Sequence, residues 1–353
     1  MISLSAASLS VARSGRPVGN RRSPLTAGQV AETGAWLAGA QLPGGMVPWY
    51  SGGHADPWNH VEVAMALSVA GQEEAARRAL RWLAGTQLPD GSWCTFYLAD
   101  GVEEPRRDPN VCAYVATGTW WHFLATGDRA LLGELWPVVE AAAGFALRMQ
   151  RPDGALRWSL DADGEASSRA LLAGTSSVHH SLRCAMAVAA ELGYERPEWE
   201  LAAERIAEAV AERPGSFWSK DRFAMDWYYP VLSGVLRGEA ARERLWDGWD
   251  RFVMPGLGVR CVVDHPWVTA AETAECAMAF HVAGLPGEAA DLLEWTDHLR
   301  DPDGGYSTGC VHPACRRFPA GETTTYSAGA VVVADRVVFG EGGPAGVFAD
   351  GGP

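Results

Sequence analysis

Residues 72–93 read QEEAARRALRWLAGTQLPDGSW, a helix followed by a turn, and this stretch decides the fold. Apolar side chains recur in its first part at helical spacing, at Ala75, Ala79, Leu80 and Leu83. The Glu and Arg residues between them face water, so the pattern predicts an amphipathic helix with one buried face. The second part, QLPDGSW, ends that helix, because Pro and Asp-Gly supply a stop and a turn.

The same turn recurs along the chain, as QLPGGMVPW at 41–49, QRPDGALRW at 150–158 and RDPDGGYS at 300–307. In each copy an aromatic residue that follows the glycine can pack back over the preceding helix. Four copies at the ends of four similar helices indicate a repeated structural motif. The motif therefore predicts architecture and does not identify a substrate.

Two kinds of helix alternate along the chain. Helices with a charged outer face are expected at 27–41, 72–87, 128–149, 196–212, 239–253 and 287–299. Helices that are apolar most of the way round are expected at 57–70, 109–126, 175–193, 225–236, 267–283 and 323–339. Strict alternation makes six helical hairpins, and six hairpins can close into a ring with the apolar set inside.

The predicted fold is therefore all-α, an (α/α)6 barrel formed by a single catalytic domain over residues 25–340. An open helical solenoid is the alternative, although neither end of the chain has the polar face of a capping repeat. Residues 1–24 are Ser- and Arg-rich and are expected to form a disordered leader. Residues 341–353 are Gly-rich and are expected to form a flexible tail.

The composition excludes several classes of partner. The 353 residues carry a net charge of −14, which disfavours binding to nucleic acid. No run of about 18 apolar residues is present, so no membrane span is expected. The seven scattered cysteines form no C-x-x-C pair and indicate reduced thiols in the cytoplasm. Nothing in the sequence defines an oligomeric state.

Polar and aromatic residues gather where each inner helix is expected to begin, and parallel inner helices would bring these six starts to one mouth of the ring. Carboxylates, amides and hydroxyls suit sugar hydroxyl groups, and Trp or Tyr suits the C–H faces of a sugar ring. We therefore expect a carbohydrate site. The candidates for binding are Trp58, His60, Glu62, Asp108, Asn110, His179, His180, Asp226, Trp227, Tyr228, Trp267, Glu275 and Thr323.

Each candidate also has a structural interpretation. Asp56-Pro57 and Asp108-Pro109 have the form of helix caps, the two histidines can be hydrogen-bonded core residues, and single Trp residues usually pack. Glu272 and Glu275 are harder to explain in that way, because they lie one turn apart in an apolar helix and burial of an unpaired carboxylate is costly. A salt bridge to Arg260 or Arg183 remains the structural alternative for them.

Glycoside hydrolysis requires two carboxyl groups across the scissile bond, and in inverting enzymes they lie about 6.5–9.5 Å apart. Asp56 and Glu272 start the first and fifth inner helices and can face each other across the mouth. A helix N-terminus favours an ionised Asp56, which suits a general base. We expect Glu272 to lie deeper, where burial raises a pKa and suits a general acid. The reverse assignment stays open, as do Asp226, Glu62 and Glu275 as substitutes.

Two other functions remain possible. The turn motif resembles that of terpene cyclases and protein prenyltransferases, but the Asp-x-Asp-Asp acid motif of the cyclases is absent. Cys310 and His312 lack a convincing third zinc ligand, so neither a metal nor an organic cofactor is expected. A ring that binds carbohydrate or another partner without catalysis is the third possibility.

Four segments, GGHADPWNHVEVAMALSVAG (52–71), MDWYYPVLSG (225–234), PGLGVRCVVDHPWVTAAETAE (255–275) and LRDPDGGYSTG (299–309), resemble a family of actinobacterial proteins with prenyltransferase-like turns. The resemblance covers about residues 25–340 and is greatest to the mycobacterial methylmannose polysaccharide hydrolases. It implies an (α/α)6 endo-α-mannosidase that cuts α-1,4-linked 3-O-methylmannose chains inside the cell. It also implies that Asp56 and Glu272 form the acid/base pair.

Overall fold

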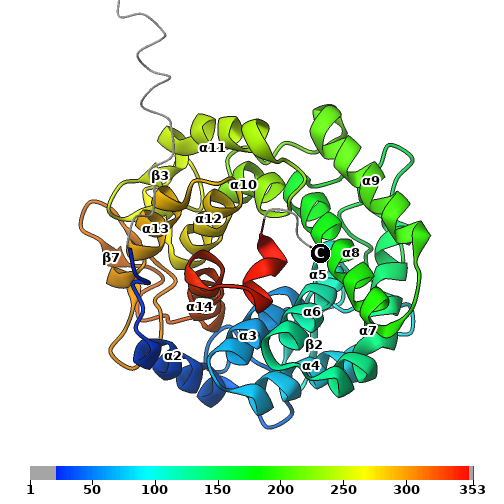
Figure 1. Ribbon diagram of the computed structural model, residues 1–353, viewed down its shortest axis with the longest axis horizontal. Coiled ribbons are helices and arrows are strands. Elements are labelled where there is room, and N and C mark those ends of the chain that lie inside the picture. The colour runs from blue at the N-terminus through cyan, green and yellow to red at the C-terminus, as the bar shows by residue number, and fades with distance from the viewer. Residues whose placement is uncertain (1–20, 350–352) are drawn as a thin grey trace, which may run out of the picture.

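The computed structural model describes residues 21–349 and 353, so most of the leader expected at 1–24 lies outside the described residues. Figure 1 shows two concentric rings of helices, which confirms the (α/α)6 barrel predicted from the alternating helix types. The outer ring consists of α2 (Ala27–Ala40), α4 (Glu73–Thr86), α7 (Arg129–Met149), α9 (Pro197–Glu212), α11 (Gly238–Phe252) and α13 (Pro286–Glu294).

The inner ring consists of α3 (Pro57–Val69), α5 (Pro109–Ala113), α6 (Val115–Thr126), α8 (Leu172–Leu192), α10 (Ala224–Leu232), α12 (Ala270–Val282) and α14 (Thr325–Phe339). Several boundaries differ from the predicted helices, since α8 starts three residues early and α10 ends four residues early. The second inner helix is interrupted at Tyr114, which separates α5 from α6. The fifth starts three residues late, because Trp267–Thr269 forms strand β5.

Three of the repeated turns tie the outer helix that precedes them to the next outer helix. Gln87 ends α4, and its Nε2 donates to Gly91 O within the turn (3.1 Å) and to Val138 O of α7 (2.9 Å). Gly91 adopts a positive φ of 84°, and a Cβ there would lie 2.2 Å from Ala141 O. Gln41 and Gln150 make the same pair of bonds at the turns of their own hairpins. The prediction of a structural motif is thereby confirmed.

The fourth copy of the turn closes the ring. Gly304 follows the last outer helix, and its carbonyl accepts a hydrogen bond from Thr33 Oγ1 of α2, the first outer helix (2.9 Å). Arg300 forms an ion pair with Glu32 beside it (2.8 Å). The first and sixth hairpins are thus joined directly, which excludes the open solenoid.

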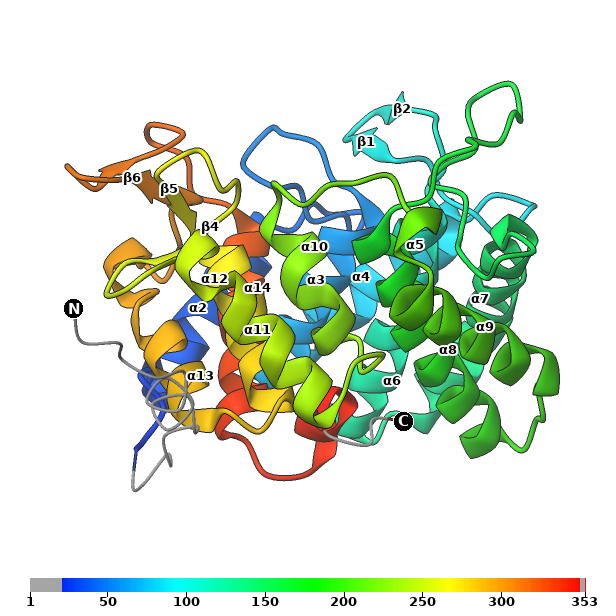
Figure 2. The ribbon, with the colours of Figure 1, turned by 90° about the horizontal axis from the view of Figure 1, so that it is seen from above.

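Short strands lie on the face where the inner helices begin (Figure 2). β1 (Phe96–Leu98) and β2 (Gly101–Glu104) form a hairpin. A five-stranded antiparallel sheet has the order β3 (Val253–Met254), β4 (Gly258–Arg260), β5 (Trp267–Thr269), β6 (Gly309–Val311) and β7 (Arg316–Arg317). Because β5 leads straight into α12, this sheet fixes the start of the helix that carries Glu272 and Glu275.

The prediction of a flexible tail at 341–353 is wrong for residues 343–348, because they form the 3-10 helix η4 (Gly343–Phe348). Val347 and Phe348 are buried; Phe348 stacks on the His180 ring (4.6 Å between centroids), and Val347 O is 3.0 Å from His180 Nε2. Figure 1 shows η4, in red, over the centre of the ring. Two apolar residues thus anchor a segment whose glycine content indicated looseness.

One described helix, α7, is long and apolar enough by length and composition to cross a membrane. Its place in the outer ring explains its apolar character, because 56% of its most apolar stretch is buried against the rest of the protein. Leu135, Val139 and Phe145 are among the buried residues.

Candidate functional site

Asp56 caps the first inner helix and is held by three donors. Its Oδ1 accepts from Asn59 N (3.0 Å), and its Oδ2 accepts from Asn59 Nδ2 and from Trp49 Nε1 (both 2.6 Å). Burial raises the pKa of the Asp56 carboxyl, and the three donors oppose that rise. Donors of this kind favour an ionised carboxylate at a helix start.

Glu62 and Glu275 are both buried and lie close to each other across the ring. Burial raises the pKa of Glu62 well above its ordinary value, and the charges of Glu275, Asp56 and Glu272 add to that rise. Burial also raises the pKa of Glu275 to about 7, although hydroxyl donors from Tyr228 and Tyr229 oppose the shift. Four carboxyl groups so arranged cannot all be ionised, and we call these four residues the acid cluster.

Glu272 is the most exposed member of the acid cluster and lies in the first turn of α12. Its Oε2 accepts a hydrogen bond from Thr269 Oγ1, and its charge contributes to the raised pKa of the Cys261 thiol beside it. The expectation that Glu272 is the deeply buried carboxylate is wrong, because Glu275, one turn further along α12, holds that place. No salt bridge from Arg260 or Arg183 reaches either glutamate among the described residues.

Aromatic rings surround the acid cluster. Trp58 stacks on Tyr114 with centroids 3.8 Å apart and planes within 10°, and Tyr229 lies 5.8 Å from Trp58. Trp49 meets Tyr326 edge to face at 5.0 Å. The sequence interpretation overlooked Trp49, although it is the aromatic residue of the first turn motif, QLPGGMVPW.

Asp108 and Asn110 lie at the start of α5. Asp108 caps α5 by accepting from Asn110 N (2.9 Å), and burial raises its pKa to about 6. The Asn110 Oδ1 atom is inaccessible to solvent and accepts no hydrogen bond from any described residue. These two residues lie on an inner helix that packs beside α3, and their role in binding stays a prediction.

The three candidate histidines contact the backbone of neighbouring segments. His60 points outward, with Nδ1 accepting from Val47 N (3.1 Å) and Nε2 facing Ala79 O of α4 (2.9 Å). His179 contacts Ser233 O (3.3 Å), and His180 contacts η4. Burial lowers the pKa of each to about 4, so the rings stay neutral. Each ring thus contacts the backbone within the protein, and a role of the three histidines in binding substrate stays a prediction.

Asp226 and Trp227 also serve the fold. Asp226 Oδ1 accepts from Ala173 N in the first turn of α8 (3.2 Å), and its Oδ2 accepts from Lys220 N (3.2 Å). Asp226 thus caps the neighbouring inner helix, and both of its oxygens accept from backbone amides. Trp227 faces outward, donates to Arg244 O (2.8 Å) and stacks on Phe252 of α11 (5.2 Å). Its neighbour Tyr228 instead turns inward to Glu275.

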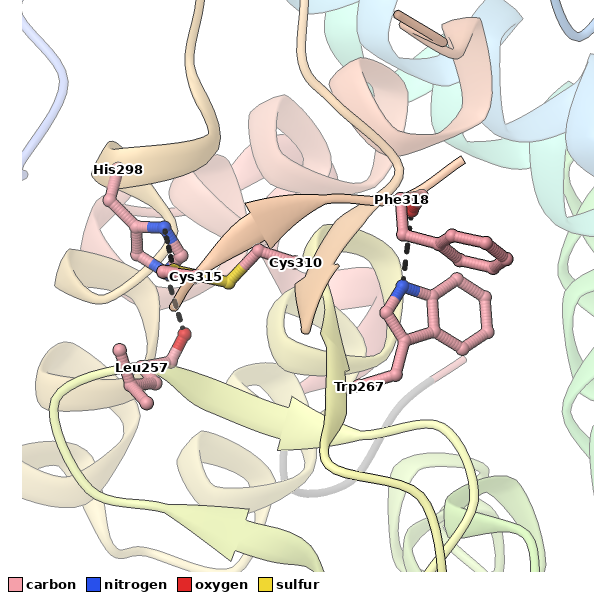
Figure 3. Close-up of a disulfide and its surroundings, with 6 residues drawn as sticks. All are labelled: Leu257, Trp267, His298, Cys310, Cys315 and Phe318. Atoms are coloured by element: carbon pink, nitrogen blue, oxygen red, sulfur yellow. Dashed lines mark hydrogen bonds between the residues drawn. A yellow bond between two sulfur atoms is a disulfide. The ribbon is translucent and has the colours of Figure 1, made fainter. Parts of the chain in front are cut away.

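Trp267 and Thr323 lie at the sheet above the ring. Trp267 Nε1 donates to Phe318 O (3.1 Å), and the two rings meet edge to face at 5.7 Å (Figure 3). Thr323 forms an isolated bridge with Ser307. Trp267 thus contacts the segment after β7, and Thr323 pairs with the segment before β6; the role of both residues in binding stays a prediction.

Three described residues, His298, Cys310 and Cys315, have side chains arranged so that they could surround a metal ion. Figure 3 shows, however, that Cys310 and Cys315 are joined in a disulfide, beside which the His298 ring lies against Leu257 O. Oxidised sulfurs are not thiolate ligands, so this group does not fit a metal in the state shown. The disulfide also corrects the expectation that all seven cysteines are reduced, although Cys94, Cys112, Cys184, Cys261 and Cys276 are free.

Solved structures similar to this chain share its fold. A glycosidase in complex with glucose aligns with a TM-score of 0.71 at 16% identity, over 89% of this chain and 96% of its own. A mannosylglycerate hydrolase from Thermus thermophilus aligns at 0.61 and 12% identity, over 87% and 99%. A D-mannose isomerase aligns at 0.63 and 11% identity, over 87% and 96%. Since an isomerase and hydrolases share it, the fold alone does not determine the reaction.

No protein-family model matches the chain. A curated protein of Mycolicibacterium hassiacum, the MMP endo-(1,4)-3-O-methyl-alpha-D-mannosidase, is 48% identical over 311 residues, which are 88% of this chain and 86% of that protein. Identity of that extent spans both inner helices of the acid cluster. The chain therefore belongs to the family of the MMP endo-(1,4)-3-O-methyl-alpha-D-mannosidase.

Proposed function

We propose that the protein is a glycoside hydrolase, an endo-acting α-mannosidase that cuts α-1,4-linked 3-O-methylmannose polysaccharide. The observation that carries this proposal is the acid cluster, which gathers Asp56, Glu62, Glu272 and Glu275 at the starts of α3 and α12. The linkage, the methylation and the internal cleavage come from the name of the 48% identical relative. The aromatic rings around the cluster suit the apolar faces of sugar rings.

Hydrolysis with inversion uses two of these carboxyl groups. Asp56 takes a proton from water as general base, and the oxygen of that water attacks the anomeric carbon. Glu272 gives its proton to the glycosidic oxygen, and the bond between that oxygen and the anomeric carbon breaks. The three donors on Asp56 stabilise its ionised form before the reaction. Glu272 suits contact with substrate, because it is the cluster member that solvent reaches most easily.

Glu62 and Glu275 act behind this pair. They are buried, and their raised pKa values keep protons within the cluster near neutral pH. A neutral neighbour reduces the repulsion that would meet a negatively charged Asp56. The polysaccharide binds at the mouth of the ring. The five free cysteines suit an enzyme that acts in the cytoplasm.

The test is to incubate the purified protein with 3-O-methylated and unmethylated α-1,4-mannooligosaccharides, with α-glucans and with prenyl diphosphates. We expect internal cleavage of the methylated mannan, seen as shorter oligosaccharides by mass spectrometry, with no change in the prenyl diphosphates. Release of diphosphate while every sugar remains intact would replace the hydrolase with isoprenoid chemistry.

A further inference from the structure

A histidine from another part of the chain lies beside the disulfide of the β6–β7 hairpin. Cys310 belongs to β6, Cys315 precedes β7, and His298 belongs to the 3-10 helix η3 (Asp297–Leu299) that follows α13. One atom from each side chain, a sulfur or a ring nitrogen, lies within 4.8 Å of the other two (Figure 3). Cysteine sulfur and histidine nitrogen are ligands that zinc prefers in proteins. The fold thus gathers three potential zinc ligands, and the histidine among them is His298, although His312 is closer to Cys310 in the sequence.

The His298 ring has the orientation of a metal ligand. Its Nε2 lies 2.8 Å from Leu257 O. A carbonyl oxygen only accepts, so Nε2 carries the proton and donates, and in the neutral ring the lone pair of Nδ1 is available. Nδ1 lies 3.7 Å from Cys315 Sγ. Histidine ligands of metals are commonly held in this way, because a hydrogen bond from the other ring nitrogen to a backbone carbonyl sets the tautomer and the direction of the ring.

The disulfide does not explain why Nδ1 faces a sulfur atom. Only the S–H group of a free thiol can donate a hydrogen bond to Nδ1, and a disulfide has lost that group. Around a tetrahedral zinc ion with Zn–S near 2.3 Å and Zn–N near 2.0–2.1 Å, a sulfur and a nitrogen ligand lie about 3.5 Å apart. The observed separation of Nδ1 and Cys315 Sγ, 3.7 Å, is close to that distance. The ring is therefore placed for the reduced sulfurs.

We propose that Cys310, Cys315 and His298 form a zinc site in the reduced protein, and that the disulfide is the oxidised form of the same site. Two electrons from a small-molecule thiol reductant, with two protons, break the S–S bond and give two thiols, while the reductant becomes a disulfide. Zn²⁺ then displaces one proton from each thiol, and two thiolates and Nδ1 bind the ion. His298 is exposed and Cys315 is half-buried, so water can fill the fourth position of the tetrahedron.

Zinc would fasten more of the structure than the disulfide does. The disulfide joins two residues of one hairpin, whereas the zinc ion also joins that hairpin to η3 through His298. Cys310 pairs with Val268 of β5, and β5 leads straight into α12. The zinc site therefore braces the sheet that fixes the start of α12. It takes no part in the hydrolysis and does not rest on the proposed function.

The first test measures metal binding by the full-length protein in its two redox states. A phosphine reductant, used without air, reduces the disulfide to two thiols and becomes a phosphine oxide with oxygen from water. After dialysis against Zn²⁺, we expect about one zinc ion per chain by elemental mass spectrometry. Co²⁺ in place of Zn²⁺ should give the near-ultraviolet absorption of sulfur-to-cobalt charge transfer. The same protein kept as the disulfide should bind neither ion at this site.

The second test removes one ligand at a time. Loss of a group that only orients a ligand weakens metal binding about 10–100-fold, so we expect His298→Gln and Cys315→Ser to weaken Zn²⁺ binding at least about 10-fold. His265→Gln, which changes another exposed histidine, and Cys261→Ser, which changes a half-buried free cysteine, are the matched controls. Both controls should keep the wild-type affinity for Zn²⁺. Circular dichroism checks that each variant is folded.

Three results would overturn the zinc site. Reduced wild type that binds no Zn²⁺ would mean that the Cys315 thiol only donates a hydrogen bond to His298. Wild-type affinity in folded His298→Gln and Cys315→Ser would place the metal elsewhere. Equal binding by the oxidised and reduced proteins would show that the two sulfurs are not ligands. Each of these results leaves the proposed hydrolase intact, because cleavage of the polysaccharide is measured separately.

Discussion

At the scale of single residues, the direction of each side chain decides its role. His60 and Glu62 are two positions apart on α3, which places them about 200° apart around the helix axis. Glu62 therefore faces the other members of the acid cluster, while His60 faces the outer ring. The sequence predicted which helix starts form the site, and it could not distinguish the two faces because apolar residues surround both.

Similar reasoning explains why the depth expected for Glu272 was wrong. Glu272 and Glu275 share one face of α12, and periodicity alone does not tell which of them lies deeper. The depth is set by the sheet, because β5 brings the first turn of α12 to the surface. Tyr228 and Tyr229 then cover Glu275.

The raised pKa of Glu275 makes stability depend on pH. Its pKa is about 7 in the folded protein and about 4.5 ordinarily, so the folded state holds the proton more tightly. This contribution to stability is fully present below about pH 4.5 and is lost as the pH rises through about 7. The glutamine side chain in the Glu275→Gln variant cannot lose a proton. Relative to wild type, we expect its free energy of unfolding to rise between pH 5 and pH 8 by up to about 3 kcal/mol.

Urea unfolding of both proteins at intervals of half a pH unit measures this difference. Glu204→Gln, which removes an exposed carboxylate of α9, is the control and should follow the wild-type curve. Parallel curves for Glu275→Gln and wild type would mean that Glu275 is already ionised throughout this range.

At the scale of elements, the amphipathic pattern was sufficient to predict both sets of helices to within a few residues. It missed β5 and the break at Tyr114, because a strand of three residues or a single irregular residue leaves too short a pattern. The tail was mispredicted for another reason. Its glycines indicated looseness, whereas Val347 and Phe348 fit a buried place beside His180 that is visible only in the folded ring.

The glutamine of the turn motif should contribute measurably to stability. Gln87→Ala removes the two hydrogen bonds that tie α4 to its turn and to Val138 of α7. We expect a loss of about 1–2 kcal/mol in the free energy of unfolding. Gln72→Ala is the matched control, because Gln72 makes no capping hydrogen bond at the start of α4. Equal losses in the two variants would show that the bonds of Gln87 have no special weight.

At the scale of the whole molecule, the closed ring is what creates the site. Asp56 and Glu272 lie far apart in the chain and belong to the first and fifth hairpins. They share one acid cluster because the ring closes, with α14 packed between α12 and α3 and Gly304 bonded to Thr33. Closure was predictable from the number of hairpins, and the contacts that achieve it were not, because they depend on where the last turn meets α2.

The most direct test measures turnover and substrate binding separately in Asp56→Asn and Glu272→Gln, with 3-O-methylated α-1,4-mannooligosaccharide as substrate. Both substitutions keep the size of the side chain and remove its proton chemistry. We expect kcat to fall at least about 100-fold in each variant, since general acid/base catalysis contributes about 10²–10⁴-fold, while the dissociation constant of the oligosaccharide changes little. Near wild-type turnover in either variant would contradict the assignment of this pair as the acid and base of the hydrolase.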